Sequence, residues 1–302
     1  MAAKKIMIQA TGFGTGAGKS LVVALLLKLF HDEGLKAAPF KTLNITTATY
    51  YQGDHEFGYA QALQAFAAHQ TPDYRMNPFT IKPVSKNTYD LFLEGQCFKK
   101  SYNPKKDYFF ELLKQPFRSK ETFLPIKEAA KRCFDSLSQE YDILCLEGSG
   151  PAKLFGFGPL SDLFNLANME TAKMTHTPVL FVTDNFDSIP GILSFLSREE
   201  KEQIKGVILN KFLANDLLGA GVEKRYVKLG IKRLIAVYRE KLGQEILGVI
   251  PYFQELEEIP DLDPLVPSEK VPLDQWEKTL SSVTKIARKT INLQKIHKIM
   301  EG

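Results

Sequence analysis

Cysteine is scarce in this 302-residue sequence, which contains only Cys97, Cys133 and Cys145. Three cysteines in so long a chain provide no disulfide framework, and no two of them have the Cys-x-x-Cys spacing of a zinc or redox site. The composition therefore argues against a disulfide-stapled extracellular protein. It favours a reducing compartment, for which we expect the cytoplasm.

Long apolar runs and an excess of one charge are also missing. No apolar stretch approaches the roughly 20 residues that cross a bilayer, and the first residues lead directly into a predicted strand without the pattern of a secretory signal. The 39 basic and 35 acidic residues are interspersed, and the formal net charge is +4. We therefore expect neither a membrane nor a nucleic acid as a partner, whereas the slight positive charge suits small anionic molecules.

The most informative segment is a glycine-rich loop between an apolar run, 4–10, and an amphipathic run, 21–30. It consists of Gly12, Phe13, Gly14, Thr15, Gly16, Ala17, Gly18, Lys19 and Ser20. A strand followed by such a turn and a helix directs backbone N–H groups and the helix N-terminus at a phosphate. Lys19 would reach the β- and γ-phosphates of ATP, and the Ser20 hydroxyl would bind Mg²⁺.

The loop differs from the standard G-x-x-x-x-G-K-[ST] form, because its first glycine is Gly12, one position earlier than usual. This spacing is typical of a subset of phosphate-binding loops. A glycine-rich turn with a chance Gly-Lys-Ser is the alternative, and the flanking strand and helix patterns favour the nucleotide site.

Strand and helix patterns alternate along the chain, which predicts an α/β fold of the P-loop NTPase type, a parallel sheet with helices on both faces. The expected strands are 4–10, 36–40, 89–93, 141–147, 178–184, 206–211 and 246–251, and the expected helices are 21–34, 56–68, 125–139 and 161–174. Residues 99–122 are predicted to leave the core sheet. We expect one domain over 1–252, followed over 253–302 by an acidic, proline-punctuated linker and a single helix, 273–300, whose apolar face covers the sheet or contacts a second copy.

Acidic residues at predicted element ends are candidates for a metal site. Glu147 closes a buried strand and precedes Gly148, so its carboxylate is expected where the carboxyl ends of parallel strands form the ligand crevice. Asp184 closes another strand, and Asp54 and Glu56 stand at the start of the predicted helix 56–68. Helix caps or solvated loop charges explain Asp54 and Asp184 equally well. Glu147 is the preferred metal carboxylate.

Several stretches resemble, in order, the ATP-dependent synthetase domain of the cobyric acid synthase family, in the superfamily that also holds cobyrinic acid a,c-diamide synthase and dethiobiotin synthetase. The resemblance covers about residues 4–252. Its segments are the glycine-rich loop, 38–41 with Asn44, 56–65, 76–78 with 82–83, 147–150, Asp162 with Asn165, 178–184, 205–212 and 248–252. The segments 56–65 and 76–83 are the most specific.

The resemblance implies an enzyme that uses Mg·ATP to phosphorylate a small-molecule carboxylate, after which ammonia attacks the acyl phosphate to give an amide. It implies that Lys19 and Lys41 neutralise phosphate or carboxylate charge, with Glu147 as a further catalytic group, and that Asn210 contacts adenine. It assigns the metal to Ser20, Glu56 and Glu147, and it places Asn44, Gln61, Asn77 and Lys82 near the substrate. Gln64, by its chemistry alone, is expected to be a helix-surface amide.

The chain also departs from the family pattern. It has no Gly-x-Cys-x-Gly turn of a glutaminase nucleophile, so we expect ammonia to come from solution or from a separate glutaminase subunit. Residues 153–158 and 187–191 differ from the family's substrate segments, which puts corrinoid specificity in question.

Two other functions remain open at this point. A dethiobiotin synthetase-like enzyme, which phosphorylates a carbamate, needs no glutaminase, although the segments 56–65 and 76–78 match the amide synthases more closely. A nucleotide switch of the MinD type shares the wider fold, but the position of its signature lysine is Gly14 here. A homodimer is possible, since relatives often place the substrate site between two subunits.

Overall fold

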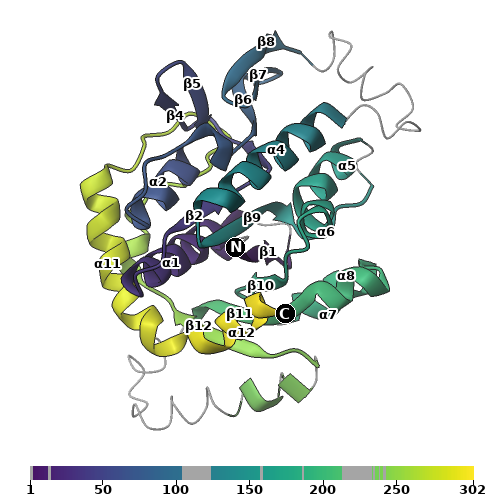
Figure 1. The fold of residues 1–302 in the computed structure, drawn as a ribbon, viewed down its shortest axis with the longest axis vertical. Coiled ribbons are helices and arrows are strands. Elements are labelled where there is room, and N and C mark those ends of the chain that lie inside the picture. The colour runs from purple at the N-terminus through teal and green to yellow at the C-terminus, as the bar shows by residue number, and fades with distance from the viewer. Residues whose placement is uncertain are drawn as a thin grey trace.

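The computed structural model describes residues 3–12, 15–103, 124–156, 159–185, 187–212, 233, 235–237, 239–240 and 243–302. Its centre is a six-stranded sheet of parallel neighbours in the order β12-β11-β10-β1-β9-β2 (Figure 1). The strands are β1 (Lys4–Ala10), β2 (Ala37–Phe40), β9 (Ile143–Pro151), β10 (Val179–Thr183), β11 (Ile204–Phe212) and β12 (Ile246–Pro251). The α/β fold expected from the sequence is confirmed.

Helices cover both faces of this sheet (Figure 1). Side chains alternate between the faces along each strand, so in β1 Ile6 and Ile8 pack with the core of α1, whereas Met7 packs with the core of α4. The first face carries α1 (Lys19–Asp32), α2 (Tyr59–Ala67), α11 (Leu273–Thr290) and α12 (Leu293–Glu301). On the other side lie α4 (Leu124–Glu140), α6 (Thr171–Met174) and α7 (Ser188–Phe195), with α5 (Pro159–Asn165) and α8 (Arg198–Gln203) near them.

A second, four-stranded sheet stands beside the core in the order β3-β6-β7-β8 (Figure 1). It consists of β3 (Leu43–Ile45), β6 (Phe79–Ser85), β7 (Thr88–Leu93) and β8 (Gln96–Tyr102), of which only β7 is predicted from the sequence pattern. Most of the predicted excursion at 99–122 lies outside the described residues. The strands of the small sheet are largely exposed or half-buried, so they give a weaker sequence signal than the continuously apolar core strands.

The placement of Glu56 in a helix is wrong. A hairpin of β4 (Thr49–Gln52) and β5 (His55–Gly58) precedes α2, so Glu56 belongs to a strand and the helix begins at Tyr59. Gly53 makes the turn with a φ of +57°, a left-handed conformation that suits glycine.

The single C-terminal helix expected over 273–300 is two helices. α11 ends where Ile291 pairs with Gly248 of β12, and the Asn292 side chain accepts a hydrogen bond from the Lys295 N–H to cap α12. Trp276, Leu280 and Ile296 are buried in the same core as α1. These helices therefore cover the sheet, as their apolar faces predict.

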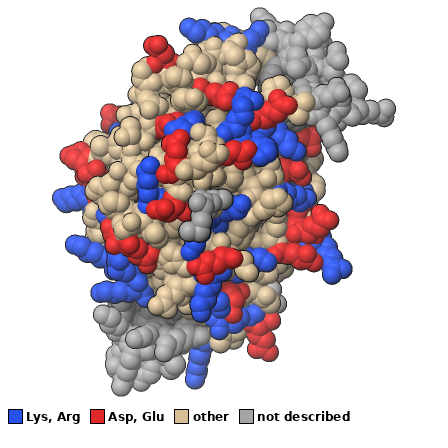
Figure 2. Space-filling model, in the orientation of Figure 1, with Lys and Arg blue, Asp and Glu red and all other residues tan. Residues whose placement is uncertain are grey.

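The outer surface carries mixed charge. Acidic and basic side chains are intermixed over the face shown in Figure 2. Among the described helices, none has the length and apolar character needed to cross a bilayer.

Candidate functional site

The glycine-rich loop joins β1 to α1, as predicted, and Gly18 is its sterically critical residue. Gly18 has a φ of +86°, and a Cβ atom there would lie 2.0 Å from the side-chain nitrogen of Asn210. That Asn210 amide donates a 3.0 Å hydrogen bond to the Ala17 carbonyl. Strand β11 thus holds the loop directly. Phe13, Gly14 and the side chain of Thr15 lie outside the described residues, whereas Gly12 and Gly16 are described.

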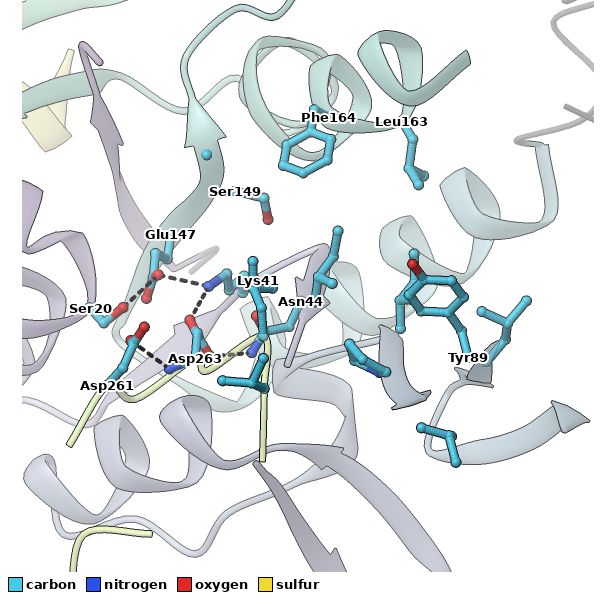
Figure 3. Close-up of a pocket in the computed structure, with 18 of the residues that line it drawn as sticks. Ser20, Lys41, Asn44, Tyr89, Glu147, Ser149, Leu163, Phe164, Asp261 and Asp263 are labelled. Atoms are coloured by element: carbon cyan, nitrogen blue, oxygen red, sulfur yellow. Dashed lines mark hydrogen bonds and ion pairs between the residues drawn. The ribbon is translucent and has the colours of Figure 1, made fainter. Parts of the chain in front are cut away.

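The carboxylate of Glu147 is the centre of a buried polar cluster at the carboxyl end of the core sheet (Figure 3). Its Oε1 accepts hydrogen bonds from Ser20 Oγ at 2.9 Å and from Lys41 Nζ at 2.8 Å. Its Oε2 accepts one from Gln64 Nε2 at 2.6 Å. The structure thus brings Ser20, Lys41 and Glu147 together. The expectation that Gln64 is a surface amide is wrong, because α2 packs against α1 and buries this side chain.

Two lysines face this carboxylate in different ways. Lys41 is fully enclosed, and although burial lowers its pKa, the carboxylates of Asp263 and Glu147 raise it well above the ordinary value. Burial lowers the pKa of Lys19, and Glu147 offsets this only in part. Lys19 has no hydrogen-bond or ion-pair partner among the described residues. It is therefore the cation with capacity left for an anionic ligand.

Ionisation of Glu147 is favoured despite its burial. Burial alone raises the pKa of a carboxyl group, but Lys41 and Lys19 together bring the pKa of Glu147 below its ordinary value. The site thus holds a stable negative charge beside a serine hydroxyl.

Asp263, which sequence reasoning missed, is the second carboxylate on Lys41. Its Oδ2 lies 2.6 Å from Lys41 Nζ, and its Oδ1 accepts a 2.6 Å hydrogen bond from Asn44 Nδ2 (Figure 3). Burial and the nearby Glu147 raise the pKa of Asp263 in spite of this ion pair. The segment resembles a solvated linker, yet the spacing of Asp261 and Asp263 was a usable signal, because alternate residues of an extended segment share a side.

Asn168 is a second residue that the sequence did not reveal. The helix expected over 161–174 contains a π-helical turn, Leu166–Glu170, in which Asn168 has non-helical φ and ψ of −110° and −106°. Its buried amide bonds the N–H and carbonyl of Ser149 and the carbonyl of Pro151. This interruption fixes the chain directly after Glu147, which is a common role for π-turns at functional sites.

The remaining predicted residues form a supporting network around β5. Asn44 donates to Gln61 Oε1 at 2.9 Å, and Asn77 accepts from the Gly58 N–H and donates to the Lys41 carbonyl. Asn44 lines the cavity described below, whereas Gln61 and Asn77 orient their neighbours from behind it.

Glu56 and Lys82 pair with each other. Thr49 Oγ1 donates a 2.5 Å hydrogen bond to Glu56 Oε1, which also accepts one from Lys82 Nζ. Neither Glu56 nor Lys82 is among the residues that line the cavity, so these contacts do not bring Glu56 to Ser20 and Glu147. Asp184, at the end of β10, is exposed.

The charged cluster opens into a cavity of about 840 Å³. One end is lined by Lys19, Ser20, Lys41, Glu147 and Asp263. The other end is apolar, and Figure 3 shows Tyr89 from β7 and Leu163 and Phe164 from α5 on that side. The cavity therefore combines charged groups suited to phosphate chemistry with a wall suited to an apolar molecular body.

The side chains at the charged end fit Mg·ATP. Ser20 Oγ and Glu147 Oε1 are adjacent hard oxygen atoms, the ligand type that Mg²⁺ uses together with waters and phosphate oxygens. The described residues contain no group of three or more acidic, histidine or cysteine side chains arranged as a complete metal cage. A metal held jointly with a nucleotide matches this donor set, and the positive charge of Lys19, which has no partner among residues that the structure describes, matches the phosphates of the nucleotide.

A family model described as the CobQ/CobB/MinD/ParA nucleotide binding domain matches residues 8–264. The chain belongs to this family. The matched range includes the glycine-rich loop and Glu147, and it extends to Asp263 in the first part of the segment that we expected to be a linker.

Several curated proteins named cobyric acid synthase are similar to this chain. Cobyric acid synthase of Caldanaerobacter subterraneus subsp. tengcongensis is 35% identical over 257 residues, which are 83% of this chain and 44% of that protein. Cobyric acid synthase of Salmonella heidelberg is 36% identical over 82% of this chain and 44% of its own length. The chain thus spans less than half the length of these relatives.

Among solved structures, MinD of Aquifex aeolicus is 12% identical over 94% of this chain and 96% of that chain, with a TM-score of 0.39. FtsY of Thermotoga maritima is 16% identical over 92% of this chain and 68% of that chain, with a TM-score of 0.35.

Proposed function

We propose that this protein uses Mg·ATP to phosphorylate a carboxylate of a small molecule, and that ammonia then displaces the phosphate to form an amide. The observation that carries the proposal is the cluster of Ser20, Lys41 and Glu147 at one end of a cavity whose other end is apolar, beside Lys19, which has no partner among the described residues. The similarity to cobyric acid synthases supports the same class of reaction.

The charge of each side chain suggests its role in binding Mg·ATP. Lys19 would bind the β- and γ-phosphates, because this cation stands at the start of α1 and has no partner in the part of the chain that the structure describes. Ser20 and Glu147 would hold Mg²⁺, which neutralises charge on the phosphates during transfer. Asn210, held against the loop, would contact adenine. For Glu56 a metal role has no support from its contacts.

Lys41 and Asn44 would hold the acceptor carboxylate. A carboxylate is a poor electrophile until an oxygen is phosphorylated, so the site must place that oxygen against the γ-phosphate. Lys41 stays protonated because its pKa is raised, and it can neutralise the carboxylate and the developing acyl phosphate without donating a proton.

The test is ADP formation with a panel of carboxylic acids, with ammonium and bicarbonate varied separately. The 302 residues contain no Gly-x-Cys-x-Gly turn, so ammonium is the nitrogen donor to supply first. We expect ADP release to require both an acid with a bulky apolar body and ammonium. A requirement for bicarbonate instead of ammonium would indicate carbamate phosphorylation, as in dethiobiotin synthetase. Steady hydrolysis that needs no acid would indicate a nucleotide switch.

A further inference from the structure

Residues 260–267, which we call the acidic strap, cross the charged end of the cavity. The strap follows β12 and passes beside β3 and β4, and Figure 3 shows the loop that carries Asp261 and Asp263 beside Glu147 and Asn44. Thr47 holds it through its N–H to the Pro264 carbonyl at 2.8 Å and its hydroxyl to the Val266 carbonyl at 3.0 Å. The strap is therefore attached mainly by hydrogen bonds.

Little apolar burial holds the strap in place. Pro264 is buried and the partly buried Leu262 packs against the core of α1, whereas Leu265 and Val266 are 56% and 70% exposed although both also line the cavity. A segment with few buried apolar contacts opens at low cost compared with a core element. The part of the strap after Leu262 can therefore leave the cavity while Leu262 stays packed on the core.

The contacts of Asp263 are those that a bound carboxylate would make. One oxygen faces the Lys41 ammonium at 2.6 Å and the other accepts from the Asn44 amide at 2.6 Å. The second hydrogen of that amide is directed to Gln61, so Asn44 has a fixed orientation. Two donors that grip both oxygens of one carboxylate form a receptor for a carboxylate.

The same two donors are the ones that the proposed reaction needs for its acceptor. Lys41 also contacts Glu147, which bonds Ser20, so a carboxylate on Lys41 lies next to the expected phosphate site. Two carboxylates cannot occupy Lys41 and Asn44 in this geometry at once. If Asp263 simply left, a buried amide hydrogen would lose its acceptor, so exchange for another carboxylate is the favourable route.

We propose that Asp263 is a built-in surrogate of the substrate carboxylate, and that the acidic strap swings out when a carboxylate substrate takes its place on Lys41 and Asn44. The inference rests on the proposed function for the identity of the incoming group. It makes the strap a self-inhibiting plug at the charged end, while the apolar end stays available for the body of the substrate.

Hydrogen exchange at the Thr47 amide tests the surrogate without any enzymatic assay. This amide donates to Pro264 in the closed strap, so its exchange rate reports the open population. Acetate is the carboxylate probe, with chloride at equal ionic strength as the control. We expect acetate, and not chloride, to accelerate exchange at Thr47. The proposal would be overturned if a saturating concentration of acetate, at constant pH and ionic strength, left the exchange rate of the Thr47 amide unchanged.

Matched variants at the two strap aspartates sharpen this measurement. Asp263→Asn removes the charge that holds Lys41, so exchange at Thr47 should rise about tenfold, the factor expected for one charge-assisted hydrogen bond, and should no longer respond to acetate. Asp261→Asn keeps the oxygen that accepts the Asp263 N–H and should behave like the wild type. Equal rates in the wild type and Asp263→Asn would contradict the surrogate role.

A disulfide that locks the strap closed tests whether the strap must open for turnover. Thr47→Cys with Val266→Cys, on a Cys97→Ser background, should close the strap when oxidised, and acid-dependent ADP formation should fall at least tenfold and return on reduction. The two single-cysteine variants should not respond to oxidation. Full turnover in the oxidised form would overturn the inference that the strap must open. If the wild type itself showed no acid-dependent turnover, the proposed function would be refuted. The exchange experiment at Thr47 would then decide whether Asp263 is a carboxylate surrogate.

Discussion

The six-stranded parallel sheet and the four-stranded sheet contribute different kinds of side chain to one cavity. The parallel sheet places Lys19, Lys41 and Glu147 near the carboxyl ends of its strands, which is where open α/β sheets bind their ligands. The four-stranded sheet contributes Ile81 and Tyr89 to the apolar wall. Under the proposed function, the parallel sheet would supply the groups for phosphoryl transfer, and the smaller sheet with α5 would select the substrate.

Loss of Lys19 should give the largest effect. Lys19→Ala removes the unpaired cation of the phosphate site, and we expect phosphoryl transfer to fall about a thousandfold or more. The fold should persist, because no ion pair is broken among the described residues. ADP release and circular dichroism measure the two effects.

Lys28→Ala is the matched control for Lys19. Lys28 lies on the same helix and pairs with Asp32 near the surface, so its loss should leave turnover unchanged. If Lys19→Ala kept the turnover of the wild type, Lys19 would not be the phosphate-binding cation, and the proposed role of the parallel sheet in phosphoryl transfer would be contradicted.

Glu147→Gln should lower both turnover and stability. The change leaves Lys41 with one carboxylate instead of two and weakens the Mg²⁺ site, so we expect a loss of about 100-fold in turnover. Because the group is fully buried in an ionic network, we also expect about 3 kcal/mol less free energy of unfolding. Urea unfolding measures this. An unaltered Mg²⁺ dependence would exclude Glu147 as the metal carboxylate.

Changes at the apolar end should affect binding more than chemistry. Phe164→Ala removes an aromatic ring from the wall, and we expect KM for the acid to rise about tenfold with kcat nearly unchanged, as for one lost apolar contact. Phe195→Ala is the control, because Phe195 is exposed and its ring contacts that of Phe155 at a tilt without lining the cavity. An equal fall in kcat would show that the wall also positions the reacting atoms.

The difference between the sheets also explains what could be predicted from sequence. The core strands are buried on both faces, so their apolar runs and the glycine-rich loop identify the fold, Ser20 and Glu147 from local pattern. Asp263 could not be assigned in this way, because its role arises from a contact with Lys41 across 222 positions of the chain. Gln64 and Asn168 depend likewise on helix packing, which leaves no local signature.

Acid unfolding should report the ionised state of Glu147. Its pKa is lower in the folded chain than the ordinary value of about 4.3, so below that pH the unfolded chain takes up the proton first. The stabilisation is therefore complete above about pH 4.3 and is lost as the pH falls through the lower pKa of the folded chain. Urea midpoints between pH 7 and 3 should decline more steeply for the wild type than for Glu147→Gln, and equal slopes would contradict the assignment.

Glu56→Gln should give the smallest changes in turnover and stability, in contrast to the same substitution at Glu147. Glu56 bonds Lys82 and Thr49 in the β5 region and does not line the cavity, so its loss should cost about 1 kcal/mol of unfolding free energy and change turnover less than about threefold. The decisive measurement is the Mg²⁺ concentration for half-maximal ADP formation, which we expect to stay at the wild-type value. A large rise would restore the metal role that the family resemblance implies, and it would extend the chemistry from the strand ends of the parallel sheet to the hairpin beside it.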